Sequence, residues 1–165
     1  MRTSLHIFAS ILIVAFALGC NSKSEEAAAY NDRLIAQQEY ILDALNELDS
    51  TLNALDTTRI DDAYHILRGR IREGLRQVDS IGTFREDESL QTATIELFKG
   101  YDEIVAGPYQ RLIDLMELPD TAFTQVEQKR ALMLEDEIIE GVESLHQDFI
   151  LRQNDFGERY NVVFE

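Results

Sequence analysis

Apolar residues recur at every seventh position through most of this chain, and this spacing restricts the folds open to it. The first stretch carries Leu34, Ile41, Leu48 and Leu55, with Leu45 and Leu52 as a companion series. A seven-residue apolar repeat forms a stripe along one side of an α-helix, whereas a half-buried strand alternates every second residue. Three later stretches carry similar series, among them Ile60 and Leu67, Leu90 and Leu97, and Ile138 and Leu145. The sequence therefore predicts helices that pack side by side.

Residues that cap or break helices divide this pattern into four segments. Gly82 suits the left-handed position after a helix, and Pro119 ends the third segment. Thr124 and Glu127 have the spacing of a capping box that opens the fourth. The predicted helices cover residues 25–55, 59–81, 88–117 and 125–158. Because short connections make consecutive helices antiparallel neighbours, we expect residues 25–165 to form an all-α domain, an antiparallel up-down-up-down four-helix bundle with a short C-terminal tail.

The composition excludes several classes of protein. With 165 residues the chain suits one domain, and its 45% hydrophobic content is too high for a disordered chain. Acidic residues number 31 against 15 basic ones, which gives a net charge of -16. This charge argues against nucleic acid as a partner, because nucleic-acid binding needs a basic surface. A single cysteine excludes internal disulfides and multi-cysteine zinc sites.

Residues 1–19 have the features of a secretory signal peptide. Arg2 precedes an apolar run from Ile7 to Leu18. This run is short for a transmembrane helix, which needs about 20 apolar residues. A charged start followed by a short apolar segment is typical of a signal peptide that is removed from the mature protein.

The end of this segment, Ala17-Leu18-Gly19-Cys20, resembles the bacterial lipoprotein box, in which small residues precede a cysteine. The resemblance implies cleavage before Cys20 and attachment of acyl chains, palmitate among them, to that residue. Residues 20–24 would then form a lipidated tether. Two or three acyl chains hold a protein firmly on a membrane, whereas one chain gives only marginal binding. The alternative is an ordinary signal peptide or short membrane anchor with an incidental cysteine.

The mature part is similar to a family of uncharacterised helical surface lipoproteins of bacteria. The resemblance rests on short motifs: Tyr30-Asn31-Asp32, Leu97-Phe98-Lys99-Gly100-Tyr101, Ile113-Asp114-Leu115-Met116 and Phe156-Gly157-Glu158-Arg159-Tyr160-Asn161. It implies a lipidated, all-helical protein, and it implies no catalytic residue because no activity is attached to the family. This chain departs from the family pattern by placing Gly107 and Pro108 inside the third helix.

Proline within a helix removes one hydrogen bond and clashes with the carbonyl four residues earlier, here that of Ile104. We therefore expect a kink or a local opening at Pro108. Tyr101 and Tyr109 flank it. One interpretation is a bend that fits the core. The other is a small pocket or hinge, in which Tyr101, Pro108 and Tyr109 would bind a ligand.

Two pairs of a carboxylate and a histidine, Asp62 with His65 and Glu143 with His146, have the spacing used in di-iron bundles. In the expected bundle the pairs lie about 20 Å apart along the axis, since each helical residue rises 1.5 Å. They cannot share metal ions, so we expect no metal site and no cofactor. No nucleophile motif or phosphate-binding glycine loop is present in the sequence, and we expect that the protein is not an enzyme.

Charge is divided unevenly among the helices. The stretch from Thr57 to Arg85, which includes the second helix, carries six arginines and four acidic residues, and we expect these arginines to pair with acidic neighbours. The fourth helix carries Glu135, Asp136, Glu140 and Glu143, which we expect on its polar side. Such an acidic surface serves solubility, or it binds a cationic partner.

These features predict a membrane-anchored bacterial lipoprotein that acts as a helical interaction or structural module. We expect it at the cell envelope, on the periplasmic or surface face of the outer membrane. The expected partners are the membrane, through the lipid on Cys20, and an envelope protein. The alternative is a helical bundle that binds a small ligand or a metal. A filled core favours the first interpretation, and an internal pocket favours the second.

Overall fold

The chain folds into an elongated bundle of long helices. The computed structural model describes the backbone of residues 6–119 and 121–164, and the side chains of these residues from Ser22 onward except Thr57. The helices are α1 (His6–Asn53), α2 (Thr57–Ile81), α3 (Ser89–Ile104), the π-helix η1 (Val105–Tyr109), α4 (Gln110–Met116) and α5 (Gln125–Tyr160). The described residues contain no strand and only one isolated bridge, in the loop after α2. The predicted all-α class is confirmed.

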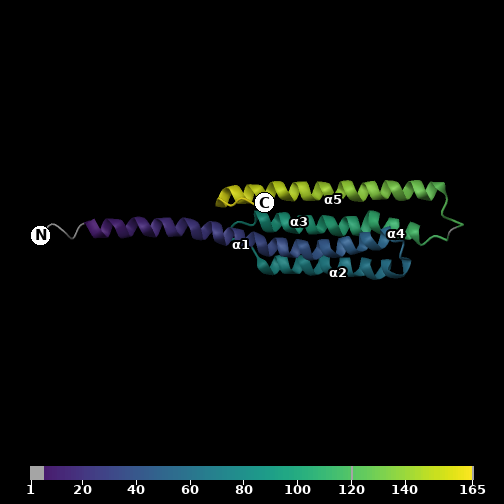
Figure 1. Ribbon diagram of the computed structural model, residues 1–165, viewed down its shortest axis with the longest axis horizontal. Coiled ribbons are helices and arrows are strands. Elements are labelled where there is room, and N and C mark those ends of the chain that lie inside the picture. The colour runs from purple at the N-terminus through teal and green to yellow at the C-terminus, as the bar shows by residue number, and fades with distance from the viewer. Residues whose placement is uncertain (1–5, 120, 165) are drawn as a thin grey trace.

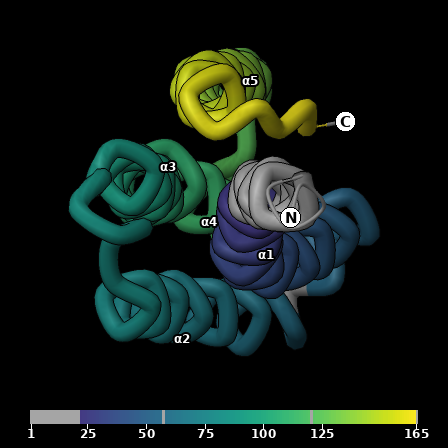
Figure 2. Tube along the Cα trace, turned by 90° about the vertical axis from the view of Figure 1, so that its left-hand side faces the viewer, coloured from purple at the N-terminus to yellow at the C-terminus, as the bar shows by residue number. Residues whose placement is uncertain are grey.

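Four rods make up the bundle, because α3, η1 and α4 follow one another without a break (Figure 1). Seen along its axis, the bundle has α2 and α5 on opposite sides, with α1 and α3 between them (Figure 2). Successive rods run in opposite directions. The middle of α1 meets the end of α2, where the Tyr30 hydroxyl donates to the Gly82 carbonyl at 2.8 Å. At the other end, Arg59 of α2 pairs with Glu47 of α1.

The third and fourth rods are antiparallel as well. At one end Arg159, in the last turn of α5, pairs with Asp87 just before α3. Further along, Arg111 of α4 pairs with Glu137 of α5 at 2.8 Å. The first turns of α5 extend beyond the ends of α1 and α2 (Figure 1).

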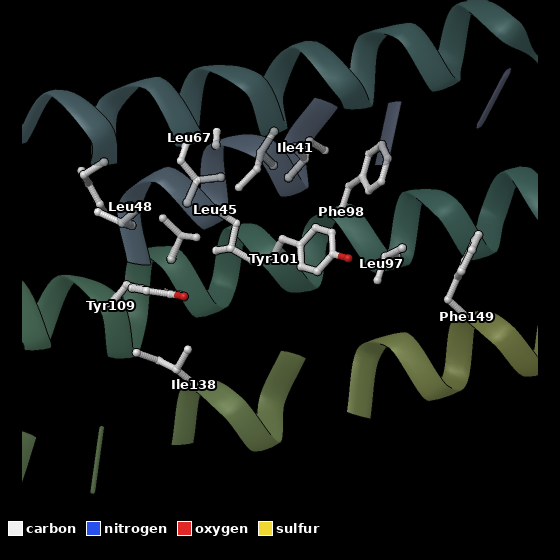
Figure 3. Packing of buried hydrophobic residues seen from close by; sticks show 14 of the residues in the cluster. Ile41, Leu45, Leu48, Leu67, Leu97, Phe98, Tyr101, Tyr109, Ile138 and Phe149 are labelled. Atoms are coloured by element: carbon white, nitrogen blue, oxygen red, sulfur yellow. The ribbon is translucent and has the colours of Figure 1, made fainter. Parts of the chain in front are cut away.

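The core consists of the apolar series read from the sequence. Leu34, Ile41 and Leu48 are fully buried and belong to one apolar core cluster with residues of α2, α3, η1 and α5. Figure 3 shows Ile41 and Leu48 beside members of this cluster from the other helices. The prediction for Leu55 is wrong, since its side chain is 72% exposed. The reason is local: α1 ends at Asn53, and Leu55 adopts a φ of 53° in the turn that leads to α2.

The capping box that opens α5 is confirmed. The Thr124 side chain accepts a hydrogen bond from the amide of Val126 at 3.2 Å, and the carboxylate of Glu127 accepts one from the amide of Thr124 at 3.3 Å. These bonds satisfy backbone donors that the first turn of a helix leaves unpaired. They fix the start of α5 directly after the turn that follows Pro119.

An aromatic cluster closes the end of the bundle near the start of the described side chains. Tyr30, Phe84, Phe156 and Tyr160 lie with ring centroids 4.7–5.8 Å apart. Gly157 lets the chain after α5 fold back over this cluster. A Cβ atom at that position would lie 2.6 Å from the carbonyl oxygen of Val162.

The backbone of α1 continues through residues 20–24, the expected tether. Ser24 already belongs to the bundle, because its hydroxyl donates to the Tyr160 carbonyl at 2.8 Å. The side chains of the expected signal peptide, residues 1–19, and of the expected lipid site, Cys20, lie outside the described residues. In the part of the chain that is described, no helix has the length and apolar character needed to cross a membrane.

Candidate functional site

The expected disturbance at Pro108 takes the form of a π-helical turn. Residues Val105–Tyr109 form η1, and Pro108 lies inside it with its side chain buried. Hydrogen bonds from residue i to i+5 widen this turn, so the missing amide hydrogen and the bulk of the proline ring are accommodated while the rod continues. Such turns occur frequently at functional sites, so η1 and the residues around it are the first candidates for a functional site.

Tyr109, the last residue of η1, reaches across to α1. Its hydroxyl donates a hydrogen bond to Oδ1 of Asp49 at 2.6 Å. Burial raises the pKa of the Asp49 carboxyl, although the hydrogen bond from Tyr109 opposes this. Burial also raises the pKa of Tyr109, and the nearby carboxylate raises it further. The pair therefore consists of a neutral phenol and a carboxylate that is partly withdrawn from water.

Tyr101, two turns earlier in α3, contacts both flanking helices. Its hydroxyl forms a hydrogen bond with Nε2 of His146 on α5, and the amide of Gln38 on α1 donates to its oxygen at 3.5 Å. Because the Tyr101 oxygen accepts a hydrogen bond from Gln38, the hydroxyl hydrogen of Tyr101 can be donated to Nε2 of His146 when that nitrogen is unprotonated. Burial lowers the pKa of His146, which agrees with a neutral imidazole, and burial raises the pKa of Tyr101 to about 12.

A third polar contact lies nearer to the aromatic cluster. There the amide of Gln153 on α5 donates to Oδ1 of Asn31 on α1 at 2.7 Å, and Asn31 is buried. The α1–α5 boundary is thus joined by amides, phenols and an imidazole. We call these seven residues the polar seam: Asn31, Gln38, Asp49, Tyr101, Tyr109, His146 and Gln153. The two helices pack against each other much less closely than α1 packs against α2.

The α1 members of this seam were not predicted, although the sequence carries a signal for them. Asn31 and Gln38 precede Leu45 and Leu52 at intervals of seven residues. Polar side chains at apolar positions of such a repeat mark a contact with special requirements. Asp49 likewise follows Leu42 by seven residues.

The three residues expected to bind a ligand, Tyr101, Pro108 and Tyr109, are all buried. The rings of Tyr101 and Tyr109 project into the core from the third rod, which consists of α3, η1 and α4 (Figure 3). The space between these rings and their apolar neighbours has no room for a water molecule. An outside molecule can therefore contact the seam only where the seam reaches the surface.

The seam reaches the surface in a groove between α1 and α5, with a volume of about 400 Å³. We call it the α1–α5 groove. Its apolar lining comes from Leu45, Tyr109, Ile138, Ile139, Val142 and Ile150. Its polar lining comes from Asp49, Glu143, His146 and Gln147. The lining thus combines an apolar surface with two carboxylates, and it includes no lysine or arginine.

Two other hollows lie at the ends of the bundle. The larger, about 1010 Å³, lies beside the aromatic cluster, and its arginines are already bound to carboxylates. Arg85 pairs with Glu26 at 2.8 Å, and Arg159 pairs with Asp87 at 3.6 Å. The smaller, about 560 Å³, lies between α4 and the first turns of α5. Neither hollow combines buried polar groups with an apolar floor as the groove does.

The two histidines with a carboxylate three residues earlier, His65 and His146, occupy different surroundings. His65 is exposed and contacts the ring of Tyr64 edge-on, whereas His146 belongs to the polar seam. Among the described residues, no three histidine, cysteine or acidic side chains are arranged to hold a metal ion.

The charged surfaces follow the expected pattern. Arg59 of α2 pairs with α1, and Arg68 pairs with Asp102 of α3 at 3.1 Å, so the prediction that arginines of this helix meet acidic neighbours is confirmed. The acidic residues expected on the outside of α5 are exposed: Glu135, Asp136, Glu140 and Glu143. Glu143 is the member of this set that lines the groove.

No protein-family model, curated protein or solved structure matches this chain. The candidate site therefore rests on its own geometry: an apolar groove with two carboxylates at its edge, above a seam of buried polar contacts.

Proposed function

We propose that this chain is a bacterial lipoprotein, held at the cell envelope by acyl chains on Cys20, whose bundle docks a partner protein along α5. The observation that carries the docking role is the apolar surface left exposed on that helix. Six large apolar side chains of α5 are exposed: Val126, Leu132, Met133, Ile139, Ile150 and Leu151. One side of α5 packs on the core through Leu134, Ile138 and Phe149, so these exposed residues lie on its remaining surface. A helix with apolar residues on both sides has room for a second neighbour.

The filled interior supports a docking role over a ligand-binding role. The space among Tyr101, Tyr109 and their apolar neighbours leaves no room for a water molecule, so the core beside η1 holds no ligand cavity. Recognition by this protein therefore uses its surface.

The position of the anchor suits such a role. Ser24 contacts the end of α5, so a lipid on Cys20 would place the aromatic cluster near the membrane and the start of α5 far from it. With 36 residues, α5 is about 54 Å long at 1.5 Å per residue. Its exposed apolar side chains, from Val126 to Leu151, would be presented along most of this length, on the part of α5 away from the membrane.

Site-specific photo-crosslinking in the native envelope tests this function. A photoreactive amino acid is placed at Ile139 of the full chain, and the matched control places it at Ile66 on α2. Both side chains are exposed, at 62% and 53%. We expect a defined protein adduct from position 139 and none from position 66. Absence of an adduct at 139, or equal adducts at both positions, contradicts docking along α5.

A further inference from the structure

The α1–α5 boundary differs in its electrostatics from four other helix boundaries of the bundle. Within the described residues, an arginine–carboxylate pair bridges each of these four: Arg59 with Glu47 for α1 and α2, Arg68 with Asp102 for α2 and α3, Arg152 with Glu96 for α3 and α5, and Arg111 with Glu137 for α4 and α5. No such pair joins α1 to α5 in this part of the chain. The polar seam, the Ser24–Tyr160 hydrogen bond and the ring contact of Tyr30 with Phe156 join the two helices instead.

The two carboxylates at the groove have no cationic partner among the described residues. Oδ1 of Asp49 accepts only from the neutral Tyr109 hydroxyl, and Glu143 accepts from the amide of Gln147 at 3.3 Å. Burial raises the pKa of Asp49, because its charged form is partly desolvated without a compensating cation. A cation brought into the groove would supply the missing interaction.

The apolar residues of the groove favour an occupant with an apolar side. Ile139 and Ile150 are exposed at the edge of the groove, and Ile138 and Leu45 lie buried beneath. Along α5, Ile139, Glu143 and Ile150 are spaced by four and seven residues. This is the spacing with which one helix presents a row of side chains to another helix.

We propose that the α1–α5 groove docks a basic amphipathic helix of a partner protein. Its apolar side packs on Ile139 and Ile150, and its lysines or arginines pair with Asp49 and Glu143. This inference rests on the proposed function and specifies the chemistry of the partner. A second copy of this chain is a poor occupant. A symmetric contact would bring Asp49 and Glu143 against the same carboxylates of the other copy.

A designed pair of peptides tests the proposal on the full lipidated chain in nanodiscs of zwitterionic lipid. The first peptide has 21 residues, made of leucine in a helical stripe and lysine elsewhere. The second replaces every lysine with glutamate. Binding is measured by fluorescence anisotropy, and empty nanodiscs give the background. We expect the lysine peptide to bind and the glutamate peptide to stay at background.

Charge-matched variants separate the groove from general attraction to an acidic protein. The double variant Asp49→Asn with Glu143→Gln should weaken the lysine peptide by about fivefold or more, because two ion pairs are lost. The control, Asp61→Asn with Asp62→Asn, removes the same charge from exposed positions of α2 and should leave binding unchanged. Asparagine at position 49 still accepts the hydrogen bond from Tyr109. The proposal would be overturned if the groove variant and the α2 control variant weakened binding of the lysine peptide equally. Tight binding of the glutamate peptide would also overturn it.

A third variant tests the apolar contact without touching the core. Ile139→Lys places a cation on an exposed position of the groove, and it should weaken the lysine peptide by about tenfold or more through like-charge repulsion. Ile66→Lys on α2 should have no effect. An adduct at position 139 in the envelope, together with failure of the lysine peptide to bind, would leave the proposed function standing and overturn the basic-helix inference. Specific peptide binding without any such adduct would support the inference and contradict the proposed function.

Discussion

The Tyr109 hydroxyl donates a hydrogen bond of 2.6 Å to Oδ1 of Asp49, and this contact connects the π-helical turn η1 to α1. The two residues are 60 positions apart in the sequence. Both also line the α1–α5 groove, so one contact links the irregular turn, the polar seam and the candidate docking surface.

Loss of the Tyr109 hydroxyl should destabilise the bundle. In Tyr109→Phe the half-buried Asp49 carboxylate loses its donor, and leaving a buried acceptor unsatisfied costs about 1–3 kcal/mol. The free energy of unfolding, measured by urea denaturation, should fall by an amount in that range. Tyr40→Phe is the control, since the Tyr40 side chain is exposed, and its stability should stay near that of the parent. If Tyr109→Phe had the same free energy of unfolding as the parent, the hydrogen bond to Asp49 would contribute nothing to stability.

The raised pKa of Asp49 gives a pH dependence of defined sign. The folded state binds this proton more tightly than the unfolded state, whose pKa is near 3.8. The stability that Asp49 contributes is therefore full below that value and is lost as the pH rises through the folded pKa. The free energy of unfolding of Asp49→Asn minus that of the parent should therefore be larger at pH 7 than at pH 4. If this difference did not change with pH, the raised pKa of Asp49 in the folded state would be contradicted.

The histidine of the polar seam should act in the opposite sense. Burial lowers the pKa of His146 from 6.5, so below that pH the unfolded state binds more protons than the folded state. Its contribution to stability is present above pH 6.5 and is lost as the pH falls through the folded pKa. Between pH 7 and pH 5 the parent should lose more stability than His146→Gln, in which the amide can still bond to Tyr101. Parallel pH profiles of the two proteins would rule this out.

A methyl group at Gly157 should displace the segment that follows α5. The added Cβ would lie 2.6 Å from a backbone oxygen, that of Val162, and overpacking of this kind costs about 1–3 kcal/mol. Gly69→Ala on α2 is the matched control, because its Cβ would have no neighbour within 4 Å. That change should stabilise the protein by about 0.5–1 kcal/mol through helix propensity. The pair is compared by thermal unfolding, and equal shifts of Tm would argue against the close approach.

The anchor is tested independently of the bundle. Cys20→Ala should abolish incorporation of labelled palmitate and leave the apolar signal uncleaved by the lipoprotein peptidase. Labelling of the parent chain serves as the positive control. Lipid incorporation that persists in the variant would contradict attachment at Cys20.

The sequence by itself determined the helices and most of the core. Leu34, Ile41 and Leu48 were expected inside because a seven-residue apolar repeat is a local property of one helix, and they are buried. The capping box at Thr124 was readable for the same reason, since its partners lie within four residues. The exposure of Leu55 was not readable, because it depends on where α1 stops and on the left-handed turn that follows.

The tertiary structure alone decided where the surface stays open. Ile138 and Ile139 are neighbours in the sequence and equally apolar, yet they are 6% and 62% exposed. Periodicity assigns them to different sides of α5, but it does not say which sides another helix will cover. That depends on the separation of α1 and α5, which is held by Asn31 with Gln153 and by the tyrosines of the seam. Such contacts join residues far apart along the chain, so only the packed bundle brings them together.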